Sequence, residues 1–201
     1  MSISASLLIY ILLGYLIGSI SSSIITARMM NLPDPRSLGS GNPGATNMLR
    51  TGNKKAAGIT LVGDLLKSLI PLLAARALNA DILVLCMVGL ATILGHMYPV
   101  YYRFTGGKGV ATTVGALTGI YWPLAAIWII GWLVTARLSG YSSLAALVAT
   151  TLTPVASMAL NQHAIVTMTC VFIAIIVAWR HRSNVTRLLN GQESKIKFRS
   201  D

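Results

Sequence analysis

Apolar residues fall into long runs separated by short polar loops. Six runs are each long enough to cross the roughly 30 Å hydrocarbon core of a membrane as a helix. They extend from about Ile3 to Ala27, Ala56 to Ala77, Ile82 to Tyr102, Val110 to Ala136, Leu144 to Leu160 and Ala164 to Trp179. The fourth run contains Pro123, which suits the first turn of a new helix, after Tyr121 and Trp122, which suit an interface. The pattern therefore predicts an all-α bundle of six spans, or of seven if the fourth run is split.

The positions of lysine and arginine decide between these counts. With the N-terminus outside and seven spans, nearly every cation lies inside and only Arg76 flanks the outer side. With six spans, Arg137 and the basic tail after Arg180 would lie outside, against the positive-inside rule. We therefore predict a polytopic transmembrane helical bundle of seven spans with a cytoplasmic C-terminus, forming one domain over residues 1–201.

Composition agrees with a membrane protein but also shows an excess of cations. Apolar residues make up 54% of the chain and charged residues 10%, whereas soluble domains carry about 25% charged residues. The net charge is nevertheless +11. The few charges are therefore mostly cations, and the predicted topology gathers them at the inner face.

The first inner loop, Arg36 to Arg50, combines glycines with uncharged hydrogen-bond donors between two arginines. Glycines let the backbone approach a ligand closely, and exposed amides beside guanidinium groups bind anions. A helix starting at Ala45 would direct its N-terminus at the same anion. The candidate binding residues in this loop are Arg36, Gly39, Ser40, Gly41, Asn42, Thr46, Asn47 and Arg50.

The second inner loop contains Gly106-Gly107-Lys108-Gly109 ahead of an apolar helix. Its open amides and its point charge can hold a second phosphate, although the spacing is not that of a P-loop. His96, just before this loop, is a candidate base, phosphate donor or structural histidine.

Asp64 and Lys67 lie three residues apart on one face of the second span, where they can pair. Charges inside a membrane usually face a water-filled cavity or the protein interior. The pair therefore either lines the site or ties helices together.

Polar residues also mark the third inner link and the tail. Ser142 and Ser143 either cap the sixth span or face a phosphate at its N-terminus. On a continuing helix Asn184 shares one face with Arg180 and Arg187, and another with His181. A basic stop signal at anionic lipid explains some of these cations, but not His181 and Asn184.

Together these segments indicate that the protein binds more than one anionic group. The sequence offers no obvious catalytic nucleophile. No serine lies in a Gly-x-Ser-x-Gly elbow, and Cys86 and Cys170 lie within apolar runs. Carboxylates are scarce, so a carboxylate metal cage is not expected. We predict no metal site and no cofactor.

These motifs resemble those of the bacterial acyl-phosphate-dependent glycerol-3-phosphate acyltransferases, which are small seven-span inner-membrane enzymes. The resemblance rests on Gly39–Asn47 with Arg50, Asp64 with Lys67, Gly95 to Thr112, Tyr141-Ser142, and Arg180 to Glu193. The chain departs from the family at Arg103, often a small residue, and at Thr105, often a lysine.

The resemblance implies acyl transfer from acyl phosphate to the 1-hydroxyl of glycerol 3-phosphate, giving lysophosphatidic acid and phosphate, the first acylation step of phospholipid synthesis. It implies catalytic roles for Ser40, Lys108, His181 and Asn184. The residues implied in substrate binding are Arg36, Gly39, Gly41, Asn42, Thr46, Asn47, Arg50, Asp64, Lys67, His96, Gly106, Gly107, Gly109, Ser142, Ser143 and Arg187.

The implied location is the bacterial inner membrane, with the active site facing the cytoplasm. The implied partners are the two substrates, membrane lipid and the enzyme that makes acyl phosphate; nucleic acid is not expected. Two alternatives stay open at this stage. One is a transporter or channel for phosphorylated metabolites, which the missing internal repeat argues against. The other is a phospholipid phosphotransferase, for which the usual Asp-rich signature is absent.

Overall fold

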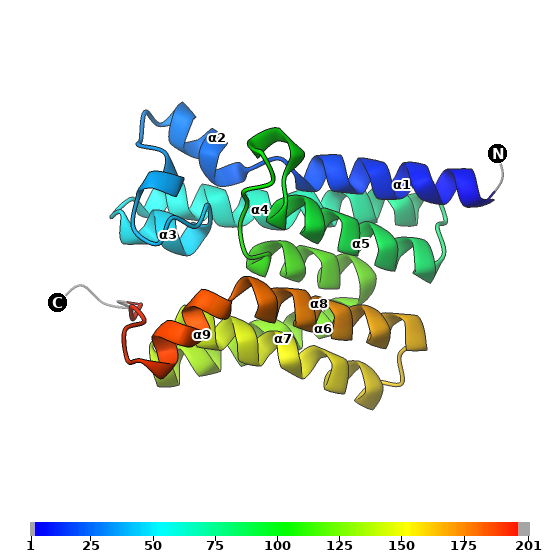
Figure 1. Ribbon diagram of the computed structural model, residues 1–201. Helices are drawn as coiled ribbons and strands as arrows, with labels where there is room; N and C mark the ends of the chain where they lie inside the picture. The colour runs from blue at the N-terminus through cyan, green and yellow to red at the C-terminus, as the bar shows by residue number, and fades with distance from the viewer. Residues whose placement is uncertain (1–2, 197–201) are drawn as a thin grey trace. The chain divides into compact units, whose positions relative to one another are not determined.

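The computed structural model describes residues 3–196, and all regular elements in this range are helical. In chain order they are α1 (Ile3–Gly18), α2 (Ser22–Met29), the 3-10 turn η1 (Pro35–Ser37), α3 (Ala45–Arg50), α4 (Lys54–Ala77), α5 (Ile82–Met97), the 3-10 turn η2 (Val100–Tyr102), α6 (Val110–Ser139), α7 (Ser142–Ala159), α8 (Ala164–Arg180) and α9 (Arg182–Leu189) (Figure 1). The predicted all-α class is confirmed.

Five segments of the described chain are long and apolar enough to cross a membrane. They are Leu7–Met29, Lys54–Ala77, Ile82–Tyr102, Val110–Ser139 and Ser142–Ala159. A sixth candidate is the pair α8 and α9, which is bent by 61°. The seven-span count and the orientation of the termini remain predictions.

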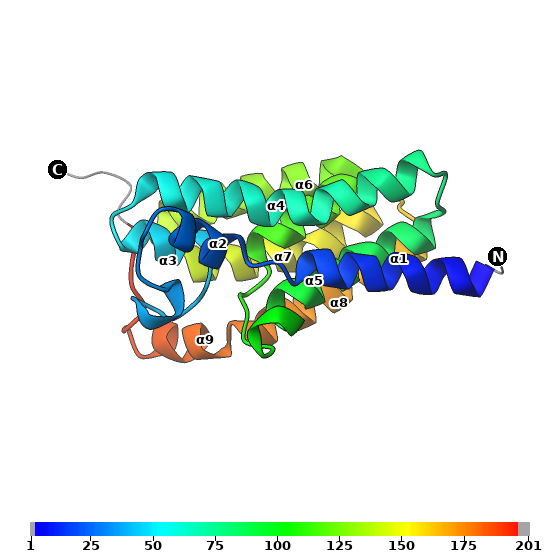
Figure 2. The ribbon, with the colours of Figure 1, turned by 90° about the horizontal axis from the view of Figure 1, so that it is seen from above.

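The helices form two compact units, residues 1–120 and 121–201. In the first unit, α1, α4 and α5 pack against one another, and α2 and α3 pack on α4 (Figures 1 and 2). The contact between α1 and α5 is close because both helices present glycine: a Cβ on Gly18 would overlap the backbone of Thr92, and one on Gly95 would overlap the backbone of Tyr15. Close approach through small residues is how helices pack in a membrane, where burial of apolar surface supplies little drive.

The first apolar run is not one helix but two, since the helix is interrupted between Gly18 and Ser22. The interruption leaves the Ile20 carbonyl outside a helical ladder, and the Lys67 ammonium donates to it at 2.7 Å. A charged side chain in α4 thus satisfies a polar backbone group that the surrounding lipid could not satisfy. The predicted single run from Ile3 to Ala27 did not include this break, although Ser19 and Ser21 to Ser23 mark it in the sequence.

The predicted break in the fourth apolar run is confirmed. Within α6 the backbone leaves the helical conformation at Tyr121 (φ −157°, ψ 100°). Pro123 has no N–H, so the helical acceptor four residues earlier, the Gly119 carbonyl, loses its donor. Arg76 replaces it, since its guanidinium donates to the carbonyls of Gly119 and Ile120 at 2.9 Å each.

The second unit contains the end of α6 with α7, α8 and α9. The Trp128 indole N–H of α6 donates to Thr150 Oγ1 of α7 at 2.9 Å, and α7 packs on α8. α9 contacts both α7 and α8. The segment after α9 returns to the link between α6 and α7, where the Ile196 N–H donates to the Gly140 carbonyl at 2.7 Å.

Candidate active site

The first glycine-rich loop is held in shape by the side chain of Asn47, which is only 1% exposed. Its amide nitrogen donates to the carbonyls of Pro35 and Leu38 at 2.8 and 3.0 Å. Its carbonyl oxygen accepts from the backbone N–H and the hydroxyl of Ser40 at 2.9 and 3.2 Å. Asn47 therefore fixes the exposed Ser40 by two bonds and closes the loop onto η1. As predicted, a helix begins at Ala45, and it places Asn47 in its first turn.

Arg36 projects from the same loop and is held by Asp34. Its guanidinium donates to both oxygens of the Asp34 carboxylate, the shortest contact being 2.6 Å, and its backbone N–H donates to the same group. The hydrogen bonds from Arg36 hold the pKa of Asp34 below its usual value. The guanidinium also lies 5.9 Å from the centre of the Tyr102 ring. Arg36 is thus oriented before any ligand binds.

Asp64, Lys67 and His96 form one buried polar cluster. Lys67 Nζ lies 2.9 Å from Asp64 Oδ1 and 2.8 Å from His96 Nδ1. With the bond to the Ile20 carbonyl, the three N–H groups of the ammonium have three acceptors within the protein. The predicted pairing of Asp64 with Lys67 is confirmed, and the cluster ties α4 to α5 and to the break between α1 and α2.

The second glycine-rich loop packs directly on His96. The Gly107 N–H donates to the His96 carbonyl at 3.0 Å, and a Cβ on Gly107 would overlap the imidazole ring. Since a lysine ammonium can only donate, His96 Nδ1 accepts, and the neutral ring carries its proton on Nε2, on the side of Gly107. The buried cluster therefore supports Gly106 and Gly107, and half-buried Lys108 follows at the start of α6.

In the second unit, the carboxylate of Glu193 binds three of the polar side chains singled out in the sequence. Its Oε1 accepts from the Ser143 hydroxyl at 2.9 Å and from the Asn184 amide at 2.7 Å. Its Oε2 accepts from Arg187 Nε at 2.7 Å. Burial alone would raise the pKa of Glu193, but these hydrogen bonds outweigh it and the pKa lies below the usual 4.5. Ser143 therefore bonds Glu193 rather than capping α7, whose N-cap residue is Tyr141.

His181 lies at the junction of α8 and α9 and is buried. Its Nδ1 lies 2.8 Å from the Val177 carbonyl. A carbonyl oxygen can only accept, so Nδ1 carries a proton, and in the neutral form of the ring Nε2 holds the lone pair. This tautomer suits a general base that acts through Nε2.

Two residues that organise these clusters, Asp34 and Glu193, were not among the sequence candidates. Both are acidic residues in strongly basic segments, and the chain has only five carboxylates. That scarcity is the signal that could have identified them. No group of three or more metal-ligating side chains occurs among residues 3–196.

Comparison with known proteins agrees with this arrangement. Residues 8–191 match the family model described as glycerol-3-phosphate acyltransferase. A glycerol-3-phosphate acyltransferase of Thioalkalivibrio sulfidiphilus is 51% identical over 91% of this chain and 90% of the relative. A glycerol-3-phosphate acyltransferase of Pseudomonas syringae pv. syringae is 49% identical over 90% of this chain and 93% of the relative.

Solved structures are similar as well. The crystal structure of PlsY (YgiH), an integral membrane glycerol 3-phosphate acyltransferase, in its glycerol 3-phosphate form, has a TM-score of 0.90 and 36% identity, covering 96% of each chain. The lysophosphatidic acid form has a TM-score of 0.88 and 35% identity over the same shares. From the family match and these relatives we conclude that the chain belongs to the glycerol-3-phosphate acyltransferase family, a family of integral membrane enzymes.

Proposed function

We propose that the protein transfers an acyl group from an acyl phosphate to the 1-hydroxyl of glycerol 3-phosphate, releasing lysophosphatidic acid and inorganic phosphate. The observation that carries this proposal is the pair of glycine-rich, cation-bearing loops in the first unit. Gly39–Asn47 is held by the amide of Asn47, and Gly106–Gly109 is supported by His96. Two such loops suit a reaction with one phosphate on the acceptor and another on the leaving group. The glycerol 3-phosphate and lysophosphatidic acid forms of the similar crystal structures support the acceptor and the product.

The reaction proceeds as a single displacement. The 1-hydroxyl oxygen attacks the acyl carbon, the bond from that carbon to the phosphate oxygen breaks, and phosphate leaves with the bonding electrons. The hydroxyl proton passes to His181 Nε2 or to the acceptor's own phosphate. The motive for a single step is the missing nucleophile: both cysteines are buried within α5 and α8.

The proposed catalytic residues are Ser40, Lys108, His181 and Asn184. Cations and amide donors stabilise the charge that develops on the carbonyl and on the leaving phosphate. Arg50 and Ser142 hold phosphate groups. Asn47, Asp64, Lys67, His96 and Ser143 are proposed to contribute to substrate binding by keeping their neighbours in place through hydrogen bonds and ion pairs. The remaining proposed binding residues are Arg36, Gly39, Gly41, Asn42, Thr46, Gly106, Gly107, Gly109 and Arg187.

The proposed location is the bacterial inner membrane with the active site on the cytoplasmic side. Acyl phosphate is amphiphilic, which suits an enzyme in a membrane. The proposed protein partner is the enzyme that makes acyl phosphate. Several apolar helices support a membrane location, and the distribution of cations supports the cytoplasmic side.

Release of phosphate from acyl phosphate by the purified protein tests the reaction. We expect release to require glycerol 3-phosphate and to be stoichiometric with lysophosphatidic acid. Lack of release at every acyl-chain length would refute the donor assignment. Trapping of an acylated enzyme with labelled acyl phosphate alone would refute the single step.

Replacement of Lys108 by alanine tests the second loop. The change removes a charge from a half-buried side chain, so we expect normal expression and a loss of about 10²–10³ in turnover, the usual effect of removing one donor to a developing anion. Lys54→Ala is the control, since Lys54 is an exposed lysine at the start of α4. Equal turnover of the two variants would exclude Lys108 from the substrate site.

A further inference from the structure

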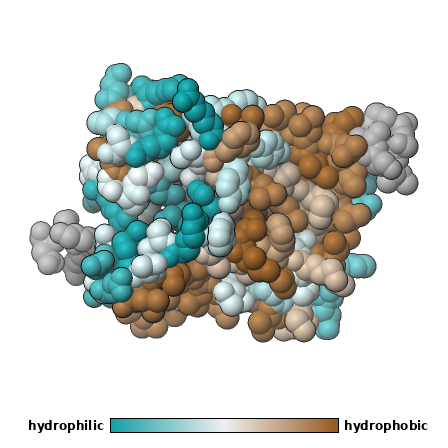
Figure 3. Space-filling view, viewed as in Figure 1, coloured by the Kyte–Doolittle hydropathy of each residue, from teal (hydrophilic) through white to brown (hydrophobic). Residues whose placement is uncertain are grey.

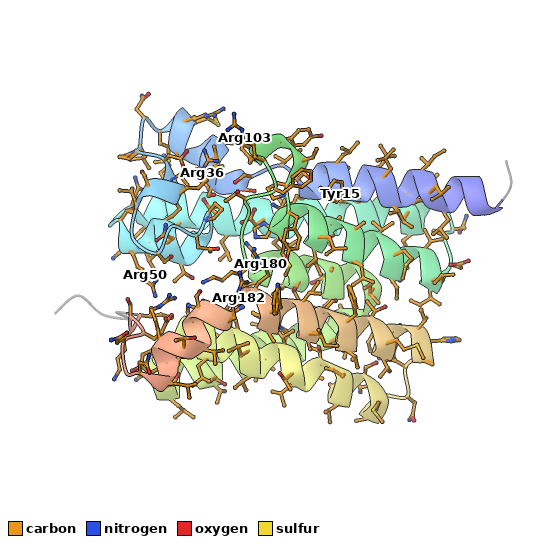
Figure 4. The ribbon with its side chains drawn as sticks, in the orientation of Figure 1. Tyr15, Arg36, Arg50, Arg103, Arg180 and Arg182 are labelled. Atoms are coloured by element: carbon orange, nitrogen blue, oxygen red, sulfur yellow. The ribbon has the colours of Figure 1, made fainter. Side chains whose placement is uncertain are left out.

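An open pocket in the first unit is lined almost entirely by arginine and tyrosine. Its volume is about 560 Å³, and its lining residues are Arg28, Arg36, Tyr101, Tyr102 and Arg103. They come from α2, from η1, from η2 and from the turn that ends η2. Figure 4 shows Arg36 and Arg103 close together from these separate segments. Of the candidate substrate-binding residues, only Arg36 lines this pocket.

The charge of this arginine pocket matches a doubly charged anion. Three guanidinium groups contribute three positive charges, and Asp34 neutralises one of them through its bidentate contact with Arg36. Two positive charges remain. A phosphate monoester carries about 1.5 to 2 negative charges at neutral pH, whereas a phosphodiester carries one. Guanidinium groups also bind phosphate through two parallel hydrogen bonds.

Exposed large side chains stand next in sequence to two of the pocket arginines, and Tyr101 lines the pocket itself. Met29 at the end of α2 is 79% exposed, Phe104 58% and Tyr101 56%. Large apolar side chains placed beside cations and tyrosine are typical of a membrane interface. Figure 3 shows the hydrophilic residues of the first unit gathered around α2 and the neighbouring loops, while α1 is covered by hydrophobic ones.

The turn that follows η2 has an unusual backbone conformation. Arg103 and Phe104 both have left-handed conformations, with φ of 52° and 58°. Non-glycine residues adopt this conformation at a cost, and two in succession are uncommon. Bonds from the Phe104 and Thr105 N–H groups to the carbonyls of Pro99 and Tyr102 hold the turn. The turn thus places Arg103 in the pocket lining and the exposed Phe104 directly after it in the chain.

We propose that the arginine pocket binds the phosphate-monoester headgroup of an acidic membrane lipid, with Arg28 and Arg103 as its principal ligands and Arg36 as a preoriented third. Met29, Tyr101 and Phe104 lie against the acyl chains. This second lipid site shares Arg36 with the first glycine-rich loop, while its principal ligands lie outside both loops. It does not depend on the identity of the acyl donor. It would hold the phosphate of lysophosphatidic or phosphatidic acid at the membrane surface.

The test compares two variants of the full-length protein in neutral detergent. Arg28→Gln/Arg103→Gln removes the two principal ligands, and glutamine tolerates the left-handed turn no worse than arginine does. Lys54→Gln/Lys55→Gln is the matched control: it removes the same charge from exposed side chains of the same unit. Binding of short-chain phosphatidic acid, phosphatidylglycerol and phosphatidylcholine is measured by calorimetry in saturating glycerol 3-phosphate.

We expect the wild type and the lysine control to bind phosphatidic acid equally, and more tightly than the other two lipids. The arginine variant should bind it at least about tenfold more weakly, because two charge-assisted hydrogen-bonding groups are lost. Its elution profile and melting temperature should match those of the control, which separates loss of binding from misfolding.

Three results would overturn the proposal. Wild-type affinity of the arginine variant for phosphatidic acid would show that no site exists at Arg28 and Arg103. Equal weakening in both would show that general charge attraction suffices. Loss of wild-type phosphatidic acid binding in saturating glycerol 3-phosphate would show that the lipid and glycerol 3-phosphate compete for one site, so that no second lipid site exists.

Discussion

Replacing Asn47 by alanine should release the loop that carries Ser40 without unfolding the helices. The side chain makes four hydrogen bonds, all to residues between Pro35 and Ser40. Alanine leaves these groups without their partner. Because α3 and α4 do not depend on those bonds, the effect should be local.

The size of the effect follows from which partners water can reach. Ser40 is exposed, so its N–H and hydroxyl exchange one partner for water at little cost. Pro35 is buried, and its carbonyl loses a donor that water replaces poorly. An unsatisfied buried group costs about 1–3 kcal/mol and an exchanged bond about 1 kcal/mol or less. We therefore expect loop opening to become easier by about 2–3 kcal/mol.

Hydrogen exchange measures this opening directly. The Ser40 N–H is bonded to Asn47, and the Gly41 N–H to the Leu38 carbonyl at 2.9 Å. A change of 2–3 kcal/mol corresponds to exchange that is about 30- to 150-fold faster at these amides, since 1.4 kcal/mol is a factor of ten. Amides in the middle of α4 should keep their wild-type rates. Acyl transfer should fall in parallel, because Ser40 loses its fixed position.

Asn42→Ala is the matched control for stability, because no hydrogen bond of the Asn42 side chain occurs among the described residues. It should leave exchange at Ser40 unchanged. Asn47→Asp adds a second test: it keeps the shape but turns a donor toward the Pro35 and Leu38 carbonyls into an acceptor. Wild-type protection of Ser40 in both Asn47 variants would refute the idea that this side chain organises the loop.

Three further predictions address other parts of the molecule. Gly107→Ala should lower the melting temperature and activity, because its Cβ overlaps the His96 ring, at a cost of about 1–3 kcal/mol; Gly58→Ala, where a Cβ meets open space, should do neither. Arg76→Gln should destabilise the fold by about 1–3 kcal/mol in thermal unfolding, because the Gly119 and Ile120 carbonyls lose a charged donor; wild-type stability would show that other donors replace it. Glu193 has a lowered pKa in the folded state, so its stabilisation is complete above pH 4.5 and is lost as pH falls through the folded value. The melting temperature of the wild type should drop in that acidic range. The Glu193→Gln variant should have a lower melting temperature at neutral pH and lack this drop. Parallel curves of melting temperature against pH would contradict the role of Glu193.

The helices and the break at Tyr121 were predictable because they depend on local properties. An apolar run of membrane length and a proline without an N–H act within a few residues of chain. The pairing of Asp64 with Lys67 was predictable for the same reason, since one turn of helix brings the two side chains together. The bond that Lys67 donates at the break between α1 and α2 was not predictable, because Lys67 lies 47 residues away from its acceptor.

The candidate loops were recognisable from their glycines and cations, yet the side chains that hold them were not. Asn47 reads in sequence as one more polar loop residue, but its burial makes it the support of Ser40. Glu193 reads as an isolated acid in a basic tail, but it binds Ser143, 50 residues earlier.

By itself, the sequence determined that this is a helical membrane protein with anion-binding loops, because hydrophobic length, glycine and charge act locally. Only the tertiary structure decided which polar groups support those loops and which, like Arg28 and Arg103, meet in a separate pocket. Hydrogen bonds and ion pairs between distant segments exist only once packing has removed water and brought donor and acceptor within 3 Å or so of each other.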